Sequence, residues 1–411
     1  MRSMGRLGIP VYAVNGDSGA AAFTSRYCRR GYFWDLDVAC PEKTAERLSV
    51  VGRMAGQRPI LIPTTEDAAV FVAENAPALK ETFIFPDQSP ALVRSLASKK
   101  EMYHLVRRLG IPTPETSFPQ TRSDVIDFLE RATFPIMLKG IDGVRLLKRT
   151  GHKMAIVRSK RELVEMYDAM EDPENPNLML QEYIPGGDDT IWMFNGYFNE
   201  NSDCLVGFTG KKIRQFPVYT GATSLGVCLP NETVAKTTKE FMKTVGYRGI
   251  LDIGYRYDAR DGLYKVLDVN PRLGGTFRLF VGENGLDVVR ALYLDLTGQP
   301  VPETVAPSGR KWIVEDSDLV SCVRYYRDGK LTFRQWVKSL RGIREGAFWA
   351  FDDPRPFLRL FAKDLRVALH RIFVKAASPA GSPQYPEGRP DVQASSLASA
   401  SIVPAEADRK L

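Results

Sequence analysis

The sequence has no long apolar segment and no paired cysteines. No apolar run approaches the ~18 residues that a membrane-spanning helix needs, and the start of the chain lacks the apolar core of a signal peptide. The five cysteines are scattered and odd in number, without a C-x-x-C pair. We therefore expect reduced thiols and a cytoplasmic protein.

Several common functional signatures are also absent from the sequence. The three histidines form no cluster, so neither a zinc site nor a Ser-His-Asp arrangement is indicated. The turn Gly16-Asp17-Ser18-Gly19 matches neither a Walker A loop nor a G-x-G-x-x-G turn. No zinc-finger spacing, basic stripe or aromatic RNA-binding motif occurs, so we expect no nucleic-acid partner.

The composition is that of an ordinary globular protein. Hydrophobic residues make up 44% and charged residues 26% of the 411 residues, which suggests two or three domains with buried cores. The formal net charge of +7 favours anionic ligands such as nucleotides, carboxylates or an anionic membrane surface.

The first part of the chain alternates between short apolar segments and helical patterns. This alternation is typical of a parallel α/β sheet. The expected strands are 9–14, 60–63 and 82–85, and the expected helices are 41–54 and 66–80.

From Ser98 onward the pattern indicates α+β lobes with antiparallel sheets. A helix at 99–109 ends at Gly110, which a proline soon follows, and this combination is a stop signal. Strands are expected at 136–139, 154–157, 178–184, 191–197, 204–213, 250–257 and 264–270, with helices at 159–170, 232–245 and 287–296.

The end of the sequence divides into a basic helix and a tail. Residues 357–375 predict a basic amphipathic helix, which either packs on the rest of the protein or lies on a membrane surface. Residues 377–411 are rich in Ala, Ser and Pro without periodicity, so we expect them to be disordered.

The segment Asp268-Val269-Asn270-Pro271-Arg272 carries the strongest chemical signal. On a strand, Asp268 and Asn270 point to the same face, where two oxygen ligands can hold Mg²⁺ together with substrate phosphates. Arg272 follows at the strand exit and can clamp phosphate or carboxylate oxygens. The alternative is an ordinary strand end with a turn before the proline.

A second carboxylate lies on the preceding strand. Asp252 shares one strand face with Gly254 and Arg256, and this polar face is expected to look into a site. Asp252 is therefore a candidate metal ligand, although a solvated strand face would have the same pattern.

Three lysines are candidate phosphate ligands. Lys139 ends an apolar strand, where an unpaired ammonium group would be costly and a phosphate is a natural partner. Lys100 opens a helix, where an anion is also stabilised by the helix N-terminus. Lys153 begins the strand after the loop 140–152. Solvated surface lysines remain the alternative for Lys100 and Lys153.

A further apolar strand leads into a Gly-rich turn in the segment Gln181-Glu182-Tyr183-Ile184-Pro185-Gly186. Its backbone could contact a purine edge, and Asp188 or Asp189 could bind a ribose hydroxyl. An ordinary strand and turn would look the same.

Together these motifs resemble the ATP-grasp superfamily, specifically its carboxylate–amine ligase group with D-aspartate ligase-like proteins. The order of the motifs carries the resemblance: a helix-opening lysine, F-P-x-x-L-K, Q-E-Y-I-P-G, a strand carboxylate and D-V-N-P-R. The resemblance implies an α/β plus α+β protein whose ATP-grasp lobes grip ATP. The implied domains are a truncated pre-ATP-grasp α/β domain at 1–93, two ATP-grasp lobes at 94–300, a C-terminal extension at 301–376 and the tail at 377–411.

The resemblance also implies roles for individual residues. The ATP phosphates would be bound by Lys100, Lys139 and Lys153, the adenine by Glu182, Tyr183 and Ile184, and the ribose by Asp189. Mg²⁺ or Mn²⁺ would be held by Asp252, Asp268 and Asn270, and the catalytic residues would be Lys139 and Arg272, which faces the transferred phosphate. Arg214 is a further candidate for binding the acceptor.

The sequence departs from the family pattern in three places. It begins at what resembles the end of the family's first helix, so the first strand and its Gly-rich turn are expected to be missing, for example through a late start codon. The loop 140–152 is less Gly-rich than many ATP-grasp phosphate loops. Gly254 stands where an acidic residue is expected.

The implied reaction activates a carboxylate as an acyl phosphate and joins it to an amine, with release of ADP and phosphate. Small-molecule carboxylates and amines are the expected partners. Two alternatives remain: a non-catalytic ATP-binding module, in which Gly254 has removed a metal ligand, and a membrane-surface-associated protein with a peripheral membrane contact through residues 357–375.

Overall fold

The computed structural model describes residues 1–35, 40–56, 58–152, 154–377 and 400–404, and the chain divides into two units. Unit 1 comprises Met1–Val93, Trp192–Asp252 and Asn270–Leu411, and unit 2 comprises Arg94–Ile191 and Ile253–Val269. The chain therefore crosses between the units inside the strands that carry Asp252 and Asn270.

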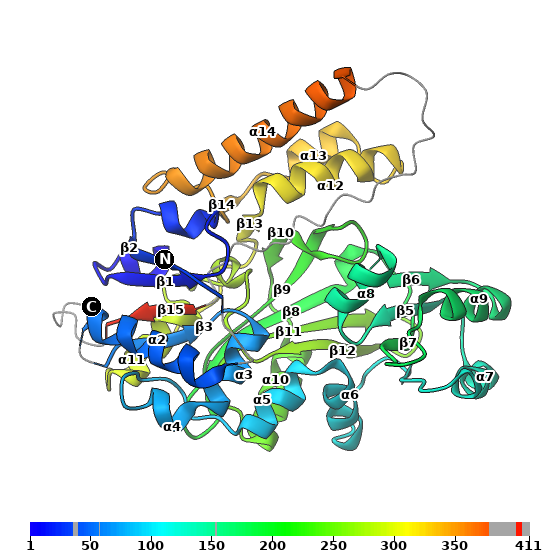
Figure 1. Ribbon diagram of the computed structural model, residues 1–411, viewed down its shortest axis with the longest axis horizontal. Helices are drawn as coiled ribbons and strands as arrows, with labels where there is room; N and C mark the ends of the chain where they lie inside the picture. Colours follow the sequence, from blue (N-terminus) through cyan, green and yellow to red (C-terminus); the bar gives the residue numbers. More distant parts are fainter. Residues whose placement is uncertain (36–39, 57, 153, 378–399, 405–411) are drawn as a thin grey trace. The chain divides into compact units, whose positions relative to one another are not determined.

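The N-terminal part of unit 1 is built on a four-stranded sheet with the order β2-β1-β15-β3 (Figure 1). Its strands are β1 (Val11–Asn15), β2 (Cys28–Phe33), β3 (Ile60–Pro63) and β15 (Ala400–Val403). β1 and β2 run parallel, although no strand was predicted at 28–33, whereas β15 runs antiparallel to both β1 and β3 and separates these two predicted strands. The sheet is therefore mixed rather than wholly parallel.

Strand β15 corrects the expectation that the tail is disordered throughout. It pairs Tyr12 with Ile402 on one side and Leu61 with Ile402 on the other. Ile402 and Val403 are 0% and 1% exposed, so this strand contributes to the core of the sheet. The remaining tail positions of that expectation, 378–399 and 405–411, lie outside the described residues.

The helices of this part follow the predicted positions with one break. They are α2 (Pro41–Ala55), α3 (Glu66–Glu74) and α4 (Ala76–Leu79). The single helix expected at 66–80 is interrupted at Asn75, which lies two residues before Pro77, because proline removes a helical hydrogen bond. The strand expected at 82–85 is reduced to one bridge, between Ile60 and Ile84.

The second sheet of unit 1 is mainly antiparallel. The first half of β11 (Gly249–Asp258) is followed in order by β8 (Ile191–Phe198), β9 (Cys204–Phe216), β10 (Ala222–Cys228), β13 (Lys311–Ile313) and β14 (Ile343–Gly346). One core cluster includes Met193, Phe208 and Phe280 with residues of α11 (Val288–Leu296). The other elements of unit 1 are α1 (Arg2–Gly5), η1 (Ala21–Thr24), α10 (Glu232–Val245) and η3 (Phe277–Leu279).

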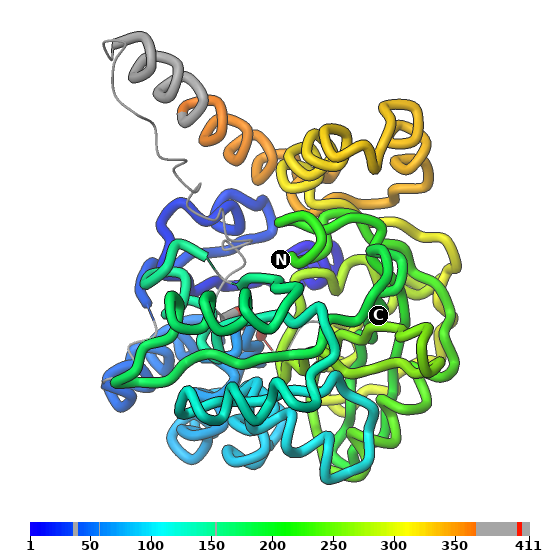
Figure 2. Tube along the Cα trace, turned by 90° about the vertical axis from the view of Figure 1, so that its right-hand side faces the viewer, coloured from blue at the N-terminus to red at the C-terminus, as the bar shows by residue number. Residues whose placement is uncertain are grey.

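Three helices form the C-terminal extension of unit 1: α12 (Glu315–Arg327), α13 (Phe333–Ser339) and α14 (Arg355–Ala377). The expected helix at 357–375 is thus confirmed. Figures 1 and 2 show α12 and α13 as neighbours and α14 leading outward beyond them. Within the described residues, no helix combines the length and apolarity needed to cross a membrane.

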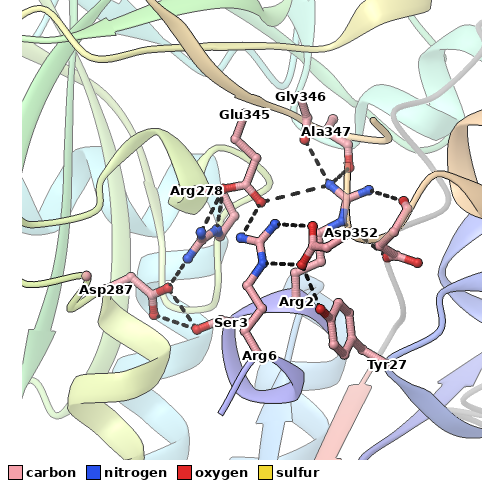
Figure 3. Close-up of polar contacts among 12 residues, drawn as sticks. Arg2, Ser3, Arg6, Tyr27, Arg278, Asp287, Glu345, Gly346, Ala347 and Asp352 are labelled. Atoms are coloured by element: carbon pink, nitrogen blue, oxygen red, sulfur yellow. Dashed lines mark hydrogen bonds and ion pairs between the residues drawn. The ribbon is translucent and has the colours of Figure 1, made fainter. Parts of the chain in front are cut away.

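A network of arginines and acids joins the extension to the start of the chain (Figure 3). Arg6 pairs with Glu345 at 3.1 Å and with Asp352 at 2.8 Å. Arg278 bridges Glu345 at 2.6 Å and Asp287 at 2.5 Å. Because Glu345 and Asp287 are buried, removing one partner would leave a desolvated charge, so this network fixes β14 and the loop after it against α1.

Unit 2 contains an antiparallel four-stranded sheet in the order β4-β7-β5-β6, as the α+β pattern predicted. Its strands are β4 (Thr116–Ser117), β5 (Ile136–Gly140), β6 (Met154–Val157) and β7 (Leu178–Glu182). The helices are α6 (Lys99–Arg108), α7 (Arg122–Arg131), α8 (Gly143–Thr150) and α9 (Lys160–Met170), with the short η2 (Asp188–Thr190). Helix α5 (Pro90–Ala97) spans the first unit boundary, and the second half of β11 and β12 (Leu263–Asn270) complete unit 2.

Candidate active site

Lys139 lies near the end of β5, a central strand of the unit 2 sheet. Ile136 and Leu138 are fully buried, and strand alternation turns Lys139 to the opposite face. The pKa of Lys139 is lowered to about 8, mainly by burial and also by the neighbouring ammonium of Lys99, while Asp268 acts in the opposite direction. The ammonium group is therefore held where an anionic ligand would stabilise it.

Lys99 is a site candidate that sequence reasoning missed in favour of its neighbour Lys100. Its ammonium group donates hydrogen bonds to the carbonyl oxygens of Gly140 at 3.2 Å and Ile141 at 2.8 Å, beside the end of β5. Both lysines follow the helix cap Ser98, whose side chain accepts from the Glu101 N–H. Because both open the same helix, the sequence contains no local signal that separates their roles.

The segment expected as a phosphate loop, 140–152, is mostly helical. The Asp142 carboxylate caps α8 by accepting from two backbone N–H groups, and Gly151 ends the helix in the left-handed conformation at φ 74°. The expectation of a loop is therefore wrong for most of this segment. Lys153, the third predicted phosphate ligand, lies outside the described residues.

The two acidic residues predicted near the nucleotide have different surroundings. The Glu182 carboxylate pairs with Arg260 at 2.7 Å and Lys265 at 3.8 Å, and the Glu182 N–H donates to the Glu115 carbonyl at 2.8 Å. Asp189 is exposed in η2. The side chain of Glu182 thus belongs to an ion-pair network with Arg260 and Lys265.

The side chain of Arg256 contacts the turn after β7 at Tyr183 and Gly186. Its guanidinium lies 5.3 Å from the ring centre of Tyr183 and donates to the Gly186 carbonyl at 2.7 Å. Arg256 is 7% exposed, and Ile184 is 3% exposed. The Tyr183 N–H donates to the Pro135 carbonyl at 3.1 Å. The segment predicted to contact a purine is therefore a turn packed on a buried arginine.

Gly254 on β11 faces Asp268 on the neighbouring strand β12. A Cβ atom built on Gly254 would lie 2.4 Å from Oδ1 of Asp268, which is closer than real atoms approach. The absence of a side chain at position 254 therefore makes the space that the Asp268 carboxylate occupies. An acid at this position would need Asp268 to move.

Arg272 forms a charged cluster in unit 1 with Glu66 and Asp252. Its Nη2 lies 2.6 Å from Oε1 of Glu66, and its Nη1 lies 3.6 Å from Oδ2 of Asp252. The Arg272 N–H donates to the Asn270 carbonyl at 2.8 Å. A Cβ atom on Gly274 would lie 2.5 Å from the same Asp252 oxygen, so glycine there makes room for this carboxylate.

Glu66 is the second residue that sequence reasoning missed. It begins α3, after the cap Thr65, and an acid in the first turn of a helix is ordinary because the helix dipole favours it. Its pairing with Arg272 spans 206 positions of the chain and has no local signature.

The predicted metal ligands belong to both units: Asp252 and Asn270 to unit 1, and Asp268 to unit 2. Within the described ranges, no group of three or more His, Cys, Asp or Glu side chains is arranged to hold a metal ion. The predicted set contains only two carboxylates and an amide, so it depends on phosphate oxygens to complete a coordination shell.

Arg214, proposed above as an acceptor ligand, has another role. It is 3% exposed and pairs with Asp318 through two hydrogen bonds of 2.8 and 2.9 Å. It also donates to the Ser339 hydroxyl at 2.8 Å. Because these contacts join β9 to α12 and the end of α13, the guanidinium stabilises the C-terminal extension, and the expectation of a substrate ligand is corrected.

The five cysteines agree with the expectation of reduced thiols, because all five are free. Burial raises the pKa of Cys204 to about 12 and that of Cys228 to about 11, which disfavours the reactive thiolate form. We assign no chemistry to them.

Known proteins similar in sequence to this chain include a ligase and a synthase. No protein-family model matches the chain. D-aspartate ligase from Enterococcus faecium is 27% identical over 301 residues, which span 69% of this chain and 70% of the relative. The C-terminal section of the carbamoyl phosphate synthase large chain from Methanopyrus kandleri is 21% identical over 288 residues, or 68% of this chain and 51% of the relative.

Solved structures share the fold at low sequence identity. N5-carboxyaminoimidazole ribonucleotide synthetase from Thermus thermophilus has a TM-score of 0.56 at 15% identity, covering 75% of this chain and 77% of that chain. The biotin carboxylase domain of 2-oxoglutarate carboxylase from Hydrogenobacter thermophilus, in complex with MgADP, has a TM-score of 0.55 at 15% identity, covering 75% and 69%. The predicted fold class is thereby confirmed.

Proposed function

We infer that this chain, which has the fold and sequence motifs of the ATP-grasp carboxylate–amine ligases, is itself an ATP-dependent ligase of that type. A carboxylate oxygen attacks the γ-phosphorus of ATP, and ADP leaves with the β–γ bridging oxygen. The amine nitrogen then attacks the acyl carbon, phosphate leaves, and the nitrogen loses a proton to give an amide. The observation that carries this proposal is Lys139 near the end of β5, a lysine whose pKa is lowered by burial and by the charge of Lys99.

The geometry of unit 2 supports a set of proposed nucleotide contacts. Lys139 and Lys99 supply positive charge for ATP phosphates at the end of β5, with Lys100 and Lys153 as the further lysines that the motif order implies. The backbone carbonyl of Glu182 and the N–H of Ile184 would pair with the adenine edge, because the N–H groups of Glu182 and Tyr183 already donate elsewhere. Asp189, which is exposed, would bind the ribose.

The residues around Asp268 fit a divalent cation in their chemistry. Asp252, Asp268 and Asn270 would supply oxygen ligands, and the absence of a side chain at Gly254 makes the space that the Asp268 carboxylate occupies. Mg²⁺ or Mn²⁺ bound there would neutralise charge on the transferred phosphate. Asp252 could alternatively serve to position Arg272, because its carboxylate lies 3.6 Å from that guanidinium.

Arg272 would bind the transferred phosphate or the acyl phosphate. Glu66 is a positioning residue for it, because the 2.6 Å ion pair holds the guanidinium before substrate arrives. The Arg272 side chain is 16% exposed, so its charge is partly desolvated and its attraction to an anion is less screened than at a free surface.

The substrates are proposed by class. Small-molecule amino acids and short peptides with free carboxylates and amines suit the reaction, and D-aspartate is the first carboxylate to test because a relative bears that name. We place the reaction in the cytoplasm, which the five free thiols support.

The test is a screen for ADP release over amino acids and peptides, followed by hydroxylamine trapping. With the cognate acid and ATP, we expect an acyl hydroxamate, and ¹⁸O from a labelled carboxylate should appear in phosphate. Arg272→Lys and Asp252→Asn should each reduce both signals, with partial recovery of Asp252→Asn by excess Mn²⁺ if Asp252 binds metal. ADP release without hydroxamate or ¹⁸O transfer would contradict the acyl-phosphate step.

A non-catalytic ATP-binding module is the second candidate, favoured by the lack of an acidic side chain at Gly254. It predicts ATP binding without ADP release across the whole screen. Nucleotide affinity and ADP release measured on one preparation therefore separate the two functions.

A further inference from the structure

The C-terminal extension carries an exposed surface of unusual composition. Of the twenty large hydrophobic residues exposed in the described chain, eleven lie between Leu319 and Leu365. Over residues 315–366, eleven lysines and arginines are exposed, against two acids, Asp328 and Asp364. This segment thus combines apolar and cationic side chains on its outside, which an isolated folded surface rarely does.

The acids of this segment are turned inward, which explains the charge imbalance at the surface. Asp318 is buried against Arg214, and Glu345 is buried among Arg6 and Arg278 (Figure 3). Their negative charges are therefore neutralised by arginines inside the protein. The eleven exposed lysines and arginines of residues 315–366 therefore lie at the surface with few acids beside them, where an anionic partner can reach them.

The apolar residues follow helical faces. On α12, Leu319, Val320, Val323 and Tyr326 have the spacing of one helix face, and they are between 36% and 64% exposed. On α14, Leu358, Phe361 and Leu365 have the same kind of spacing and are 56%, 59% and 48% exposed. Two amphipathic helices of one extension therefore leave apolar faces uncovered.

An aromatic cluster lies at the start of α14. Phe351 is 94% exposed, and its ring centre lies 5.8 Å from that of Trp349. The Trp349 ring is 5.4 Å from Phe357, which stacks with Phe361 at 6.4 Å. Aromatic side chains beside cations are typical of protein surfaces that enter the interface of a lipid bilayer.

We propose that α12, α13, α14 and the loop Trp349–Phe351 form a docking surface for an anionic lipid bilayer. The exposed cations meet the headgroups, and Phe351, Phe361 and Leu365 enter the acyl boundary. An anionic bilayer offers negative headgroups to the exposed cations and an apolar interior to the exposed hydrophobic side chains. A second copy of the chain would bring two cationic surfaces together, and a nucleic acid offers no apolar interior for Phe351. The proposal stands independently of the ligase activity.

The test is co-sedimentation of the full chain with vesicles of phosphatidylcholine, with or without phosphatidylglycerol. We expect binding to the anionic vesicles, weak binding to the neutral ones, and loss of binding at high salt. Phe351→Ser/Phe361→Ser should remove the apolar contribution. Lys363→Glu/Arg366→Glu should weaken partitioning by at least about 30-fold, since each basic residue near an anionic surface contributes roughly a fivefold effect.

Matched controls change the same side chains elsewhere. Phe33→Ser replaces an aromatic residue that is 62% exposed, and Lys236→Glu/Lys239→Glu reverses two exposed charges on α10. Both control variants should bind vesicles like the wild type, and circular dichroism should show all variants folded. Equal binding of all variants, or no binding by the wild type, would refute the proposal. A concentration-dependent dimer that Phe351→Ser/Phe361→Ser disrupts would instead identify the surface as a contact between two copies.

Discussion

Raising the pH from 7 to 9 should weaken ATP binding about tenfold through Lys139 alone. The pKa of Lys139 is lowered to about 8 by burial and by Lys99, so its protonated fraction falls from roughly nine-tenths to roughly one-tenth over this range. A phosphate beside the ammonium favours the charged form, so ATP binding above pH 8 must be accompanied by uptake of a proton.

Calorimetric titration in two buffers of different ionisation enthalpy measures both quantities. At pH 9 we expect uptake of nearly one proton per ATP bound, and at pH 7 almost none. Lys139→Met should bind ATP weakly with a flat pH profile, whereas Lys236→Met, at an exposed position on α10, should keep the wild-type profile. Constant affinity from pH 7 to 9 without proton uptake would refute the phosphate role of Lys139.

The contribution of Lys139 to the stability of the fold should respond to pH with the opposite sign. The pKa of Lys139 is 10.5 in the unfolded chain and about 8 in the folded one, so between these values the unfolded state binds more protons. The contribution of Lys139 to the free energy of unfolding therefore rises with pH across that window. Weaker nucleotide binding at pH 9 thus cannot be a consequence of this residue destabilising the fold.

Two substitutions test the local geometry. Gly254→Asp should lower the free energy of unfolding by roughly 1–3 kcal/mol and should not raise activity, because its Cβ atom would lie 2.4 Å from the Asp268 carboxylate. A Gly254→Asp variant with raised activity and unchanged stability in urea unfolding would contradict this prediction. Ile402→Ala should cost about 2–4 kcal/mol, because the side chain is fully buried in β15, whereas Ile126→Ala, at a residue 48% exposed, should cost little. Equal urea midpoints for the two alanine variants would show that β15 does not contribute to the sheet.

The sequence predicted most strands and helices because their periodicity is local. Asp268 and Asn270 were assigned to one strand face from alternation alone, and Lys139 was singled out because an ammonium group at the end of an apolar strand needs a partner. The structure has both strands, β12 and β5, close to the expected positions. The roles of these residues remain predictions.

The misses share a physical cause, which is dependence on distant partners. The four residues of β15 have no periodicity of their own, and they become a strand only by pairing with β1 and β3. The role of Glu66 depends on Arg272, far along the chain. Helix α8 is the exception, because Asp142 and Gly151 were readable as caps, and the expectation of a family loop took precedence over them.

The cluster of Arg272, Glu66 and Asp252 links these observations to the mechanism. One guanidinium between two carboxylates carries a net negative charge, which opposes the approach of a phosphate. Arg272 can therefore bind a phosphate only if one carboxylate finds another positive partner. The contact with Asp252 is the longer of the two, 3.6 Å against 2.6 Å, so Asp252 is the carboxylate that leaves at lower cost. A divalent cation taking Asp252 as a ligand would leave Glu66 holding the guanidinium in place. In this arrangement the positioning role of Glu66 and the metal-binding role of Asp252 depend on each other.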